Sequence, residues 1–162
     1  MDKNIFEIRY VKYGVEEFEM IEPEYNLHKT DDGSWEFIVC FEKAKVIKRV
    51  KELEEVIDAE IHFEVTAVIS ADDLELKVGK VITQKEGYDY KRDINLSNIY
   101  YFEHEPVENL RIELVEVSQN YIIINLIAET VISDYRSGKP DAKLYIEKGK
   151  FNLNKKRIRG VC

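Results

Sequence analysis

The chain has 162 residues, of which 44% are hydrophobic and 35% are charged, a composition typical of a folded globular domain and not of a disordered chain. Its 24 basic and 32 acidic residues give a formal net charge of −8, which disfavours nucleic acid as a partner. No run of about 18 apolar residues occurs, and residues 1–4 lack the order of a signal peptide, so we expect a cytoplasmic protein with no membrane partner.

The length of the chain suits a single domain that can bury a sizeable core. Only three prolines and seven glycines are present, which leaves no room for a long flexible linker. We therefore expect residues 1–154 to form one globular domain. Residues 155–162 carry four positive charges and are predicted to form a basic, mobile C-terminal tail.

Alternation of apolar and polar residues begins near the N-terminus, as in strands with one buried face. It predicts strands over 5–10 and 35–41, the second of which follows an Asp-Asp-Gly-Ser turn at 31–34. Residues 16–24 alternate less regularly and contain five glutamates. Pro23 limits this segment to an edge strand or a loop.

The spacing of the apolar residues changes after Glu42. From there they recur every three or four positions, at Val46, Ile47, Val50, Leu53, Val56 and Ile57. This spacing predicts an amphipathic helix over about 43–58. We expect the helix to pack its apolar side on one face of a sheet.

Two hairpins are predicted in the following part of the chain. Residues 61–69 alternate and are followed by a turn at 71–73 that leads into the apolar positions of 74–78. A second hairpin joins 110–117 to 121–133, with a β-bulge near Leu114 where the alternation breaks.

The remaining segments are a loop at 87–93 and short strands at 99–102 and 144–151. The near-continuous apolar run at 121–128 favours a central strand covered on both faces. Together the elements predict an α+β fold that is predominantly antiparallel β, with a curved sheet or sandwich of about eight strands and one amphipathic helix (about 43–58) packed on it.

No catalytic, metal or cofactor site is predicted. His62 shares a strand face with Glu60 and Glu64, but such alternation is more typical of a solvated sheet face than of a metal site. Cys40 and Cys162 match no zinc or redox spacing. No serine or cysteine lies in a nucleophile motif, so the sequence leans towards a protein that is not an enzyme.

Two features favour a binding surface. The first is an acidic ribbon, and the second is a group of tyrosines, a residue type that supplies contact area at low entropic cost. The leading hypothesis is a cytoplasmic binding protein that presents this acidic, aromatic surface to a basic protein partner. Acidic immunity proteins that inhibit nucleases share this charge and size. The predicted partner-binding residues are Glu16, Glu17, Glu19, Glu22, Glu24, Tyr88, Tyr90, Tyr100 and Tyr101.

Two alternatives remain open. The chain could be a self-associating structural or chaperone-like β protein, a homo-oligomer whose exposed strand edges at 18–21 and 144–151 hold another chain. The third reading is a small-ligand-binding protein or a hydrolytic enzyme with a pocket in the sheet.

Overall fold

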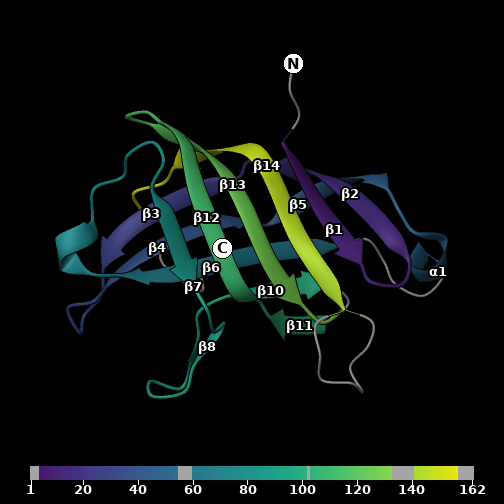
Figure 1. Cartoon of the computed structure of the whole chain (residues 1–162), viewed down its shortest axis with the longest axis horizontal. Coiled ribbons are helices and arrows are strands. Elements are labelled where there is room, and N and C mark those ends of the chain that lie inside the picture. Colours follow the sequence, from purple (N-terminus) through teal and green to yellow (C-terminus); the bar gives the residue numbers. More distant parts are fainter. Residues whose placement is uncertain (1–3, 55–59, 102, 133–140, 157–162) are drawn as a thin grey trace.

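The computed structural model describes residues 4–54, 60–101, 103–132 and 141–156, and most of them lie in β-strands (Figure 1). Twelve of the described strands form one large sheet, and two more form a small separate hairpin. The strands of the large sheet are β1 (Ile5–Tyr10), β2 (Gly14–Ile21), β3 (Glu24–Lys29), β4 (Trp35–Phe41), β5 (Lys43–Lys48), β6 (Ile61–Ile69), β7 (Val81–Gln84), β10 (Asn98–Tyr101), β11 (Glu103–Pro106), β12 (Glu108–Val117), β13 (Tyr121–Thr130) and β14 (Ala142–Leu153).

The small hairpin consists of β8 (Tyr88–Asp89) and β9 (Ile94–Asn95), and the described helical segments are a single turn, α1 (Lys51–Glu54), and a 3-10 turn at Ala71–Asp73. Neither helical segment has the length or hydrophobicity needed to cross a membrane. The fold is thus predominantly antiparallel β, as predicted, but it contains very few helical residues.

β14 is the strand on which the sheet is organised. It pairs with β13 along most of its length and with β1 at residues 142–146, and its last residues, Asn152 and Leu153, pair in parallel with β3. One wing of the sheet therefore has the order β7-β12-β13-β14-β1-β2-β5, and the other has β14-β3-β4-β6-β10-β11. All other described pairings are antiparallel, and the sheet does not close on itself.

The two wings lie across one another, with β12, β13, β14 and β1 in front of β4 and β6 in Figure 1. Their facing side chains form one hydrophobic core. At its centre the ring of Phe6 lies 5.2 Å from that of Phe41 and 5.0 Å from that of Phe63. All three side chains are almost completely buried, so the packing of the two wings gives each of them an apolar inner side and a more polar outer side.

The hairpin of β12 and β13 confirms one sequence prediction, including a bulge between Leu114 and Glu116. On β13, however, the prediction of two covered faces is wrong. Ile122, Ile124 and Leu126 are completely buried, whereas Ile127, from the other face, is 41% exposed. The strand is apolar on its outer face without being covered there by another layer of described residues.

The predicted helix over 43–58 is also wrong. Residues 43–48 form β5, which pairs with β2, and the described helical part is the single turn α1; residues 55–59 lie outside the described chain. Val46 and Ile47 are 39% and 43% exposed, so their helical spacing did not mark a buried stripe. The backbone of β2 offers unpaired hydrogen-bonding groups at this edge, and pairing with β5 outweighs the local helical preference.

Two further expectations need correction. β6 was predicted to form a hairpin with the segment after it, but the next strand, β7, pairs with β12. Of the predicted free edges, the segment 18–21 lies on β2, between β1 and β5, and residues 144–146 lie between β13 and β1. Residues 149–151 pair with β13 on one side. The described sheet instead ends at β5, β7 and β11. Short strands such as β5, β7 and β11 lie in segments without clear alternation, which explains why about eight strands were predicted and twelve are present in the sheet.

Candidate functional site

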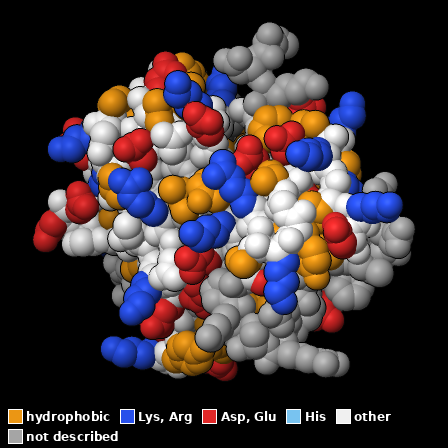
Figure 2. Space-filling model, turned by 45° about the vertical axis from the view of Figure 1, so that its right-hand side comes forward, with side chains coloured by type: hydrophobic (Ala, Val, Ile, Leu, Met, Phe, Trp, Pro, Cys, Tyr) orange, Lys and Arg blue, Asp and Glu red, His pale blue; other side chains and the backbone are white. Residues whose placement is uncertain are grey.

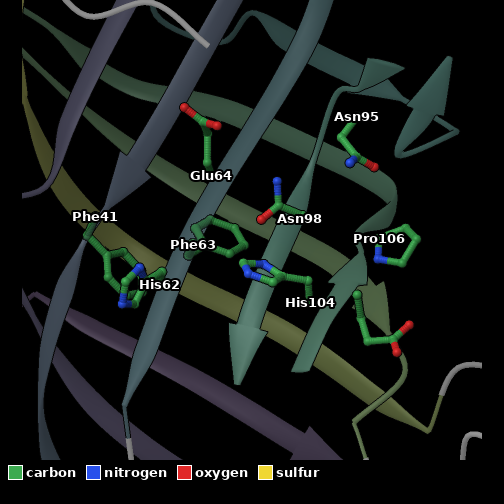
Figure 3. Close-up of a pocket in the computed structure, with 9 residues that line it drawn as sticks. Phe41, His62, Phe63, Glu64, Asn95, Asn98, His104 and Pro106 are labelled. Atoms are coloured by element: carbon green, nitrogen blue, oxygen red, sulfur yellow. The ribbon is translucent and has the colours of Figure 1, made fainter. Parts of the chain in front are cut away.

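The clearest candidate site is a polar pocket on the outer side of β6, β10 and β11, turned away from the core. It has a volume of about 510 Å³ and is called the histidine pocket below. Figure 3 shows its side chains on neighbouring strands of this wing. The residues that line it are Phe41, His62, Phe63, Glu64, Asn95, Asn98, His104, Glu105 and Pro106.

The strand register explains why these polar residues meet. Tyr100 on β10 lies opposite His62 on β6 and also opposite His104 on β11, so the three side chains form a row across three strands. Asn98, two residues before Tyr100, forms the next row with Glu64 and Pro106. Residues two positions apart on a strand share a face, and both rows therefore project to the outer side.

Tyr100 lies between the two histidines. The centroid of its ring is 5.4 Å from that of His62 and 4.9 Å from that of His104. The His62 side chain is 45% exposed, and its Nε2 atom is 3.4 Å from Oε1 of Glu60, whose side chain is 72% exposed. The rim of the pocket thus combines three flat rings with an exposed carboxylate.

The lining of the pocket contains acidic residues but no basic ones. None of the described residues that line the histidine pocket is a lysine or an arginine, whereas Glu64 and Glu105 are among them. The side chain of Glu105 projects to the opposite face from His104, because Glu105 lies opposite the buried Ile99. Burial raises the pKa of Glu105 there, and the nearby carboxylates of Glu103 and Asp141 raise it further.

A second hollow adjoins the histidine pocket at His62, which lines both. Its volume is about 460 Å³, and its lining residues are Glu42, Lys43, Ala44, Glu60, Ile61 and His62. The two hollows together present a polar, mainly acidic surface with aromatic side chains at its middle. Its chemistry suits a cationic ligand better than an anionic one.

The described residues contain no group of three or more histidine, cysteine, aspartate or glutamate side chains placed to hold a metal ion. The two histidines flank the Tyr100 ring. What the arrangement can do chemically is therefore to accept hydrogen bonds and to offer ring faces to a positively charged group.

Two of the predicted partner-binding residues lie inside the protein. Glu16 is completely buried, and its Oε1 atom accepts hydrogen bonds from the hydroxyls of Tyr10 at 2.6 Å and Tyr101 at 2.7 Å. Arg49 donates from Nε to Oε2 of Glu16 at 3.1 Å. Burial is the main cause that raises the pKa of both tyrosines well above the usual value. Glu16 and Tyr101 thus belong to an interior network and not to a contact surface.

The rest of the acidic ribbon is divided between different parts of the molecule. Glu17 and Glu19 lie on the outer side of β2, and their cross-strand neighbours on β5 are Lys48 and Lys45. Such opposite-charge neighbours offset the negative charge of the ribbon. Glu22 lies in the turn after β2 with a φ of 50°, and it is exposed.

Glu24 lies on β3, in the other wing of the sheet, where its Oε2 atom accepts a hydrogen bond from Asn154 Nδ2 at 2.8 Å. The structure therefore brings Glu17 and Glu19 together on one face and separates them from Glu16 and Glu24.

Tyr88 and Tyr90 belong to the small hairpin beside the pocket. Their rings are 4.9 Å apart, and Tyr90 is 80% exposed. Tyr88 lies opposite Asn95, which lines the histidine pocket, and donates a hydrogen bond from its hydroxyl to Asp93. Of the four predicted tyrosines, Tyr88, Tyr90 and Tyr100 thus lie around one site, whereas Tyr101 is buried.

Sequence reasoning missed His104, Asn98 and Glu105 as site residues. It noted that His62 shares a face with two glutamates, but the pairing of β6 with β10 and of β10 with β11 was not predicted. The available signal was spacing: Asn98 and Tyr100 are two positions apart, as are His104 and Pro106, so the residues of each pair share a strand face. Four-residue strands give too short a pattern to settle such a pairing.

The basic tail predicted at 155–162 is described only up to Lys156. Lys155 and Lys156 are exposed, and residues 157–162 lie outside the described chain. Comparison with models of protein families, with curated proteins and with solved structures found no match for this chain.

Proposed function

We propose that the protein binds a positively charged segment of a partner protein and that an arginine or lysine side chain of that segment enters the histidine pocket. The row of rings that His62, Tyr100 and His104 form on the outer face carries this proposal, together with the absence of lysine and arginine from the described lining of the pocket. A cation seated beside His62 would be attracted by the exposed carboxylate of Glu60, 3.4 Å from His62 Nε2, and by Glu42 in the adjoining hollow.

The lining and the Tyr100 ring beside it supply the other contacts that a guanidinium or ammonium group requires. The amide oxygens of Asn95 and Asn98 are hydrogen-bond acceptors, and the ring of Tyr100 offers a face for a cation–π contact. The exposed ring of Tyr90 on the neighbouring hairpin would extend the contact area beyond the pocket.

The charge of the whole chain supports the same partner class. A net charge of −8 attracts a basic protein over a distance and accelerates its encounter with the pocket. A nucleic-acid-cutting enzyme is basic where it holds its substrate, so an inhibitor or immunity-type role towards such an enzyme fits the proposal.

A labelled hexa-arginine peptide provides the direct test, with binding followed by fluorescence anisotropy at low and at physiological ionic strength. The double variant Glu42→Gln/Glu60→Gln removes two exposed charges from the hollow that adjoins the pocket at His62. We expect it to weaken binding about tenfold, since each lost partly exposed charge contact costs roughly 0.5–1 kcal/mol.

The matched control is Asp72→Asn/Glu75→Gln, which changes the net charge equally at two exposed residues beyond the C-terminal end of β6, whereas the pocket residues of β6 lie near its N-terminal end. We expect near-native peptide binding for this control. Equal weakening in the two double variants would mean that the peptide senses only net charge, and the pocket would lose its proposed role. If only the pocket variant binds more weakly, a photo-reactive phenylalanine analogue in place of Tyr100 can identify the natural partner by cross-linking in a native extract.

A further inference from the structure

The outer face of the other wing carries an ordered pattern of charges that does not belong to the histidine pocket. Following the register across β1, β14, β13 and β12, one row reads Glu7, Tyr145, Ile127 and Arg111. All four point outwards, and Ile127 is 41% exposed. The row therefore runs from negative on β1 to positive on β12, with two large side chains in between.

The neighbouring row runs in the opposite sense. Arg9 on β1 and Lys143 on β14 lie opposite each other, and Lys143 lies opposite Glu129 on β13. Glu129 lies opposite Glu108 on β12, which completes the row, and it accepts a hydrogen bond from Asn109 Nδ2 at 3.1 Å. Positive charge thus lies on the β1 and β14 side of this row and negative charge on the β13 and β12 side.

We propose that this face is the interface of a homodimer, in which a two-fold axis runs parallel to the strands between β14 and β13. Such an axis places β1 over β12 of the second copy and β14 over β13 of the second copy. Glu7 then meets Arg111 of the second copy, and Lys143 meets Glu129 of the second copy. Tyr145 covers Ile127 of the second copy at the centre.

Each of these contacts occurs twice because the interface is isologous, which gives four ion pairs around an apolar centre. Arg9 meets Glu108 of the second copy, a residue of opposite charge. Within its own chain Arg9 also binds Glu7 at 2.9 Å, so the Glu7–Arg111 contact between copies would extend an existing pair into a network. In the next row, Ile5 meets Glu113 of the second copy, which brings no like charges together.

The face is also large enough. Six neighbouring strands from β2 to β7 span about 29 Å at about 4.8 Å each, and their mean length of about eight residues spans about 27 Å. The resulting area of about 780 Å² matches the roughly 800 Å² that each partner buries in a standard interface. A hollow of about 520 Å³, lined in part by Ile5, Tyr145 and Ile127, lies at its middle.

The mixture of charges favours a second copy over a strongly charged partner. Figure 2 shows this side of the molecule with basic and acidic side chains interspersed around hydrophobic ones. A uniformly basic or acidic protein would meet like charges in one row or the other. Two copies of this chain meet opposite charges in both rows.

The test measures the mass of the full chain by sedimentation velocity over a range of concentrations, for the wild type, Glu7→Arg, Arg111→Glu and the double exchange. We expect a reversible dimer for the wild type. Each single variant should raise the dissociation constant about a hundredfold, tenfold for each of two symmetric contacts that become repulsive. The double exchange should restore the dimer.

Rescue by the double exchange can act only between copies, because three strand spacings, about 14 Å, separate Glu7 from Arg111 within one chain. Lys29→Glu on β3, in the other wing, is the control for charge reversal and should leave the dimer intact. Circular dichroism checks that all variants are folded. A wild type that stays monomeric at high concentration, or a double exchange that fails to restore association, would overturn the proposal.

Discussion

Arg49 and Glu16, which are 33 positions apart in the chain, form an ion pair at 3.1 Å inside the protein. The Glu16 side chain is completely buried, and the Arg49 side chain is 11% exposed. Arg49 also donates from Nη2 to the hydroxyl of Tyr101 at 2.8 Å, and the amide of Val50 donates to Glu16 at 3.2 Å. The Glu16 carboxylate on β2 thus holds both the segment after β5, through Arg49 and Val50, and Tyr101 on β10.

Removal of Arg49 should therefore destabilise the fold strongly. Arg49→Met leaves the charge of Glu16 buried without its ion partner, and we expect a loss of about 3–5 kcal/mol in the free energy of unfolding. The double variant Glu16→Gln/Arg49→Met should lose less than the sum of the two single variants, as urea denaturation can measure.

The control for that cycle is Asp73→Asn, which removes a carboxylate that is 75% exposed from its pair with Lys80, whose side chain is 7% exposed. Lys80 Nζ also donates to the backbone carbonyl oxygens of Asp73 and Glu75, so we expect a loss of at most about 1 kcal/mol. Equal losses for Arg49→Met and Asp73→Asn would show that Glu16 is not held in a buried network.

The same network predicts a loss of stability at alkaline pH. Burial and the neighbouring Glu16 raise the pKa of Tyr10 and Tyr101, so the folded chain keeps both phenol protons at a pH where the unfolded chain releases them. Their contribution to stability is complete below about pH 10 and falls as the pH rises further. Urea denaturation from pH 8 to 11 should show this decrease, and Tyr10→Phe should make it less steep. An unchanged slope in Tyr10→Phe would contradict the raised pKa.

Two isoleucines of β13 test whether this strand is covered on one face only. Ile124→Ala should cost about 2–5 kcal/mol because Ile124 is completely buried in the core. Ile127→Ala, on the opposite face of the same strand, should cost less than about 1 kcal/mol in dilute protein, since Ile127 is 41% exposed. Similar losses of unfolding free energy for both variants would mean that the outer face of β13 is also covered.

Glu105→Gln should separate stability from binding. Because the folded chain raises the pKa of Glu105, its ionised form is less favourable in the folded state than in the unfolded state at neutral pH. We expect the urea midpoint of Glu105→Gln at pH 7 to be unchanged or higher, and binding of hexa-arginine to change little, because this side chain projects away from the face of His62 and His104. A lower midpoint would contradict the raised pKa of this carboxylate.

Gly87 should tolerate no side chain. A Cβ atom at this position would lie 2.4 Å from the carbonyl oxygen of Val107 and 3.0 Å from that of Ser97, both of them backbone atoms. We expect Gly87→Ala to cost about 3 kcal/mol, at the upper end for overpacking. Gly149→Ala should cost less, because the closest atom there, at 2.4 Å, is a methyl group of the Ile146 side chain. Thermal unfolding of the two variants provides the comparison.

Sequence patterns predicted those parts of the fold that depend on near neighbours. The β12–β13 hairpin was predicted together with its bulge because both strands alternate clearly and a short turn joins them. β5 was predicted as a helix because Val46 and Val50 have helical spacing, although the deciding factor is the open edge of β2. That edge becomes visible only when the tertiary arrangement is known.

The candidate site was predicted less well than the fold, for a similar reason. Glu16 was assigned to a surface because acidic residues cluster around it, whereas its buried state depends on Arg49 and on two distant tyrosines. His62 and His104 become neighbours of Tyr100 through the register of three strands. Composition predicted the acidic and aromatic character of the site, but not which residues of each type meet.

The long-range pairing of β14 has a consequence for how this protein is made. Phe6, near the start of the described chain, lies opposite Ile146 on β14, and the same strand carries the partners of β13 and β3. During synthesis β1 and β3 can pair early with β2 and β4, but the sides of β1 and β3 that pair with β14 stay open until β14 has left the ribosome. Such non-local pairing slows folding and exposes the growing chain to aggregation, so its yield in cells should depend on chaperones that shield nascent strands.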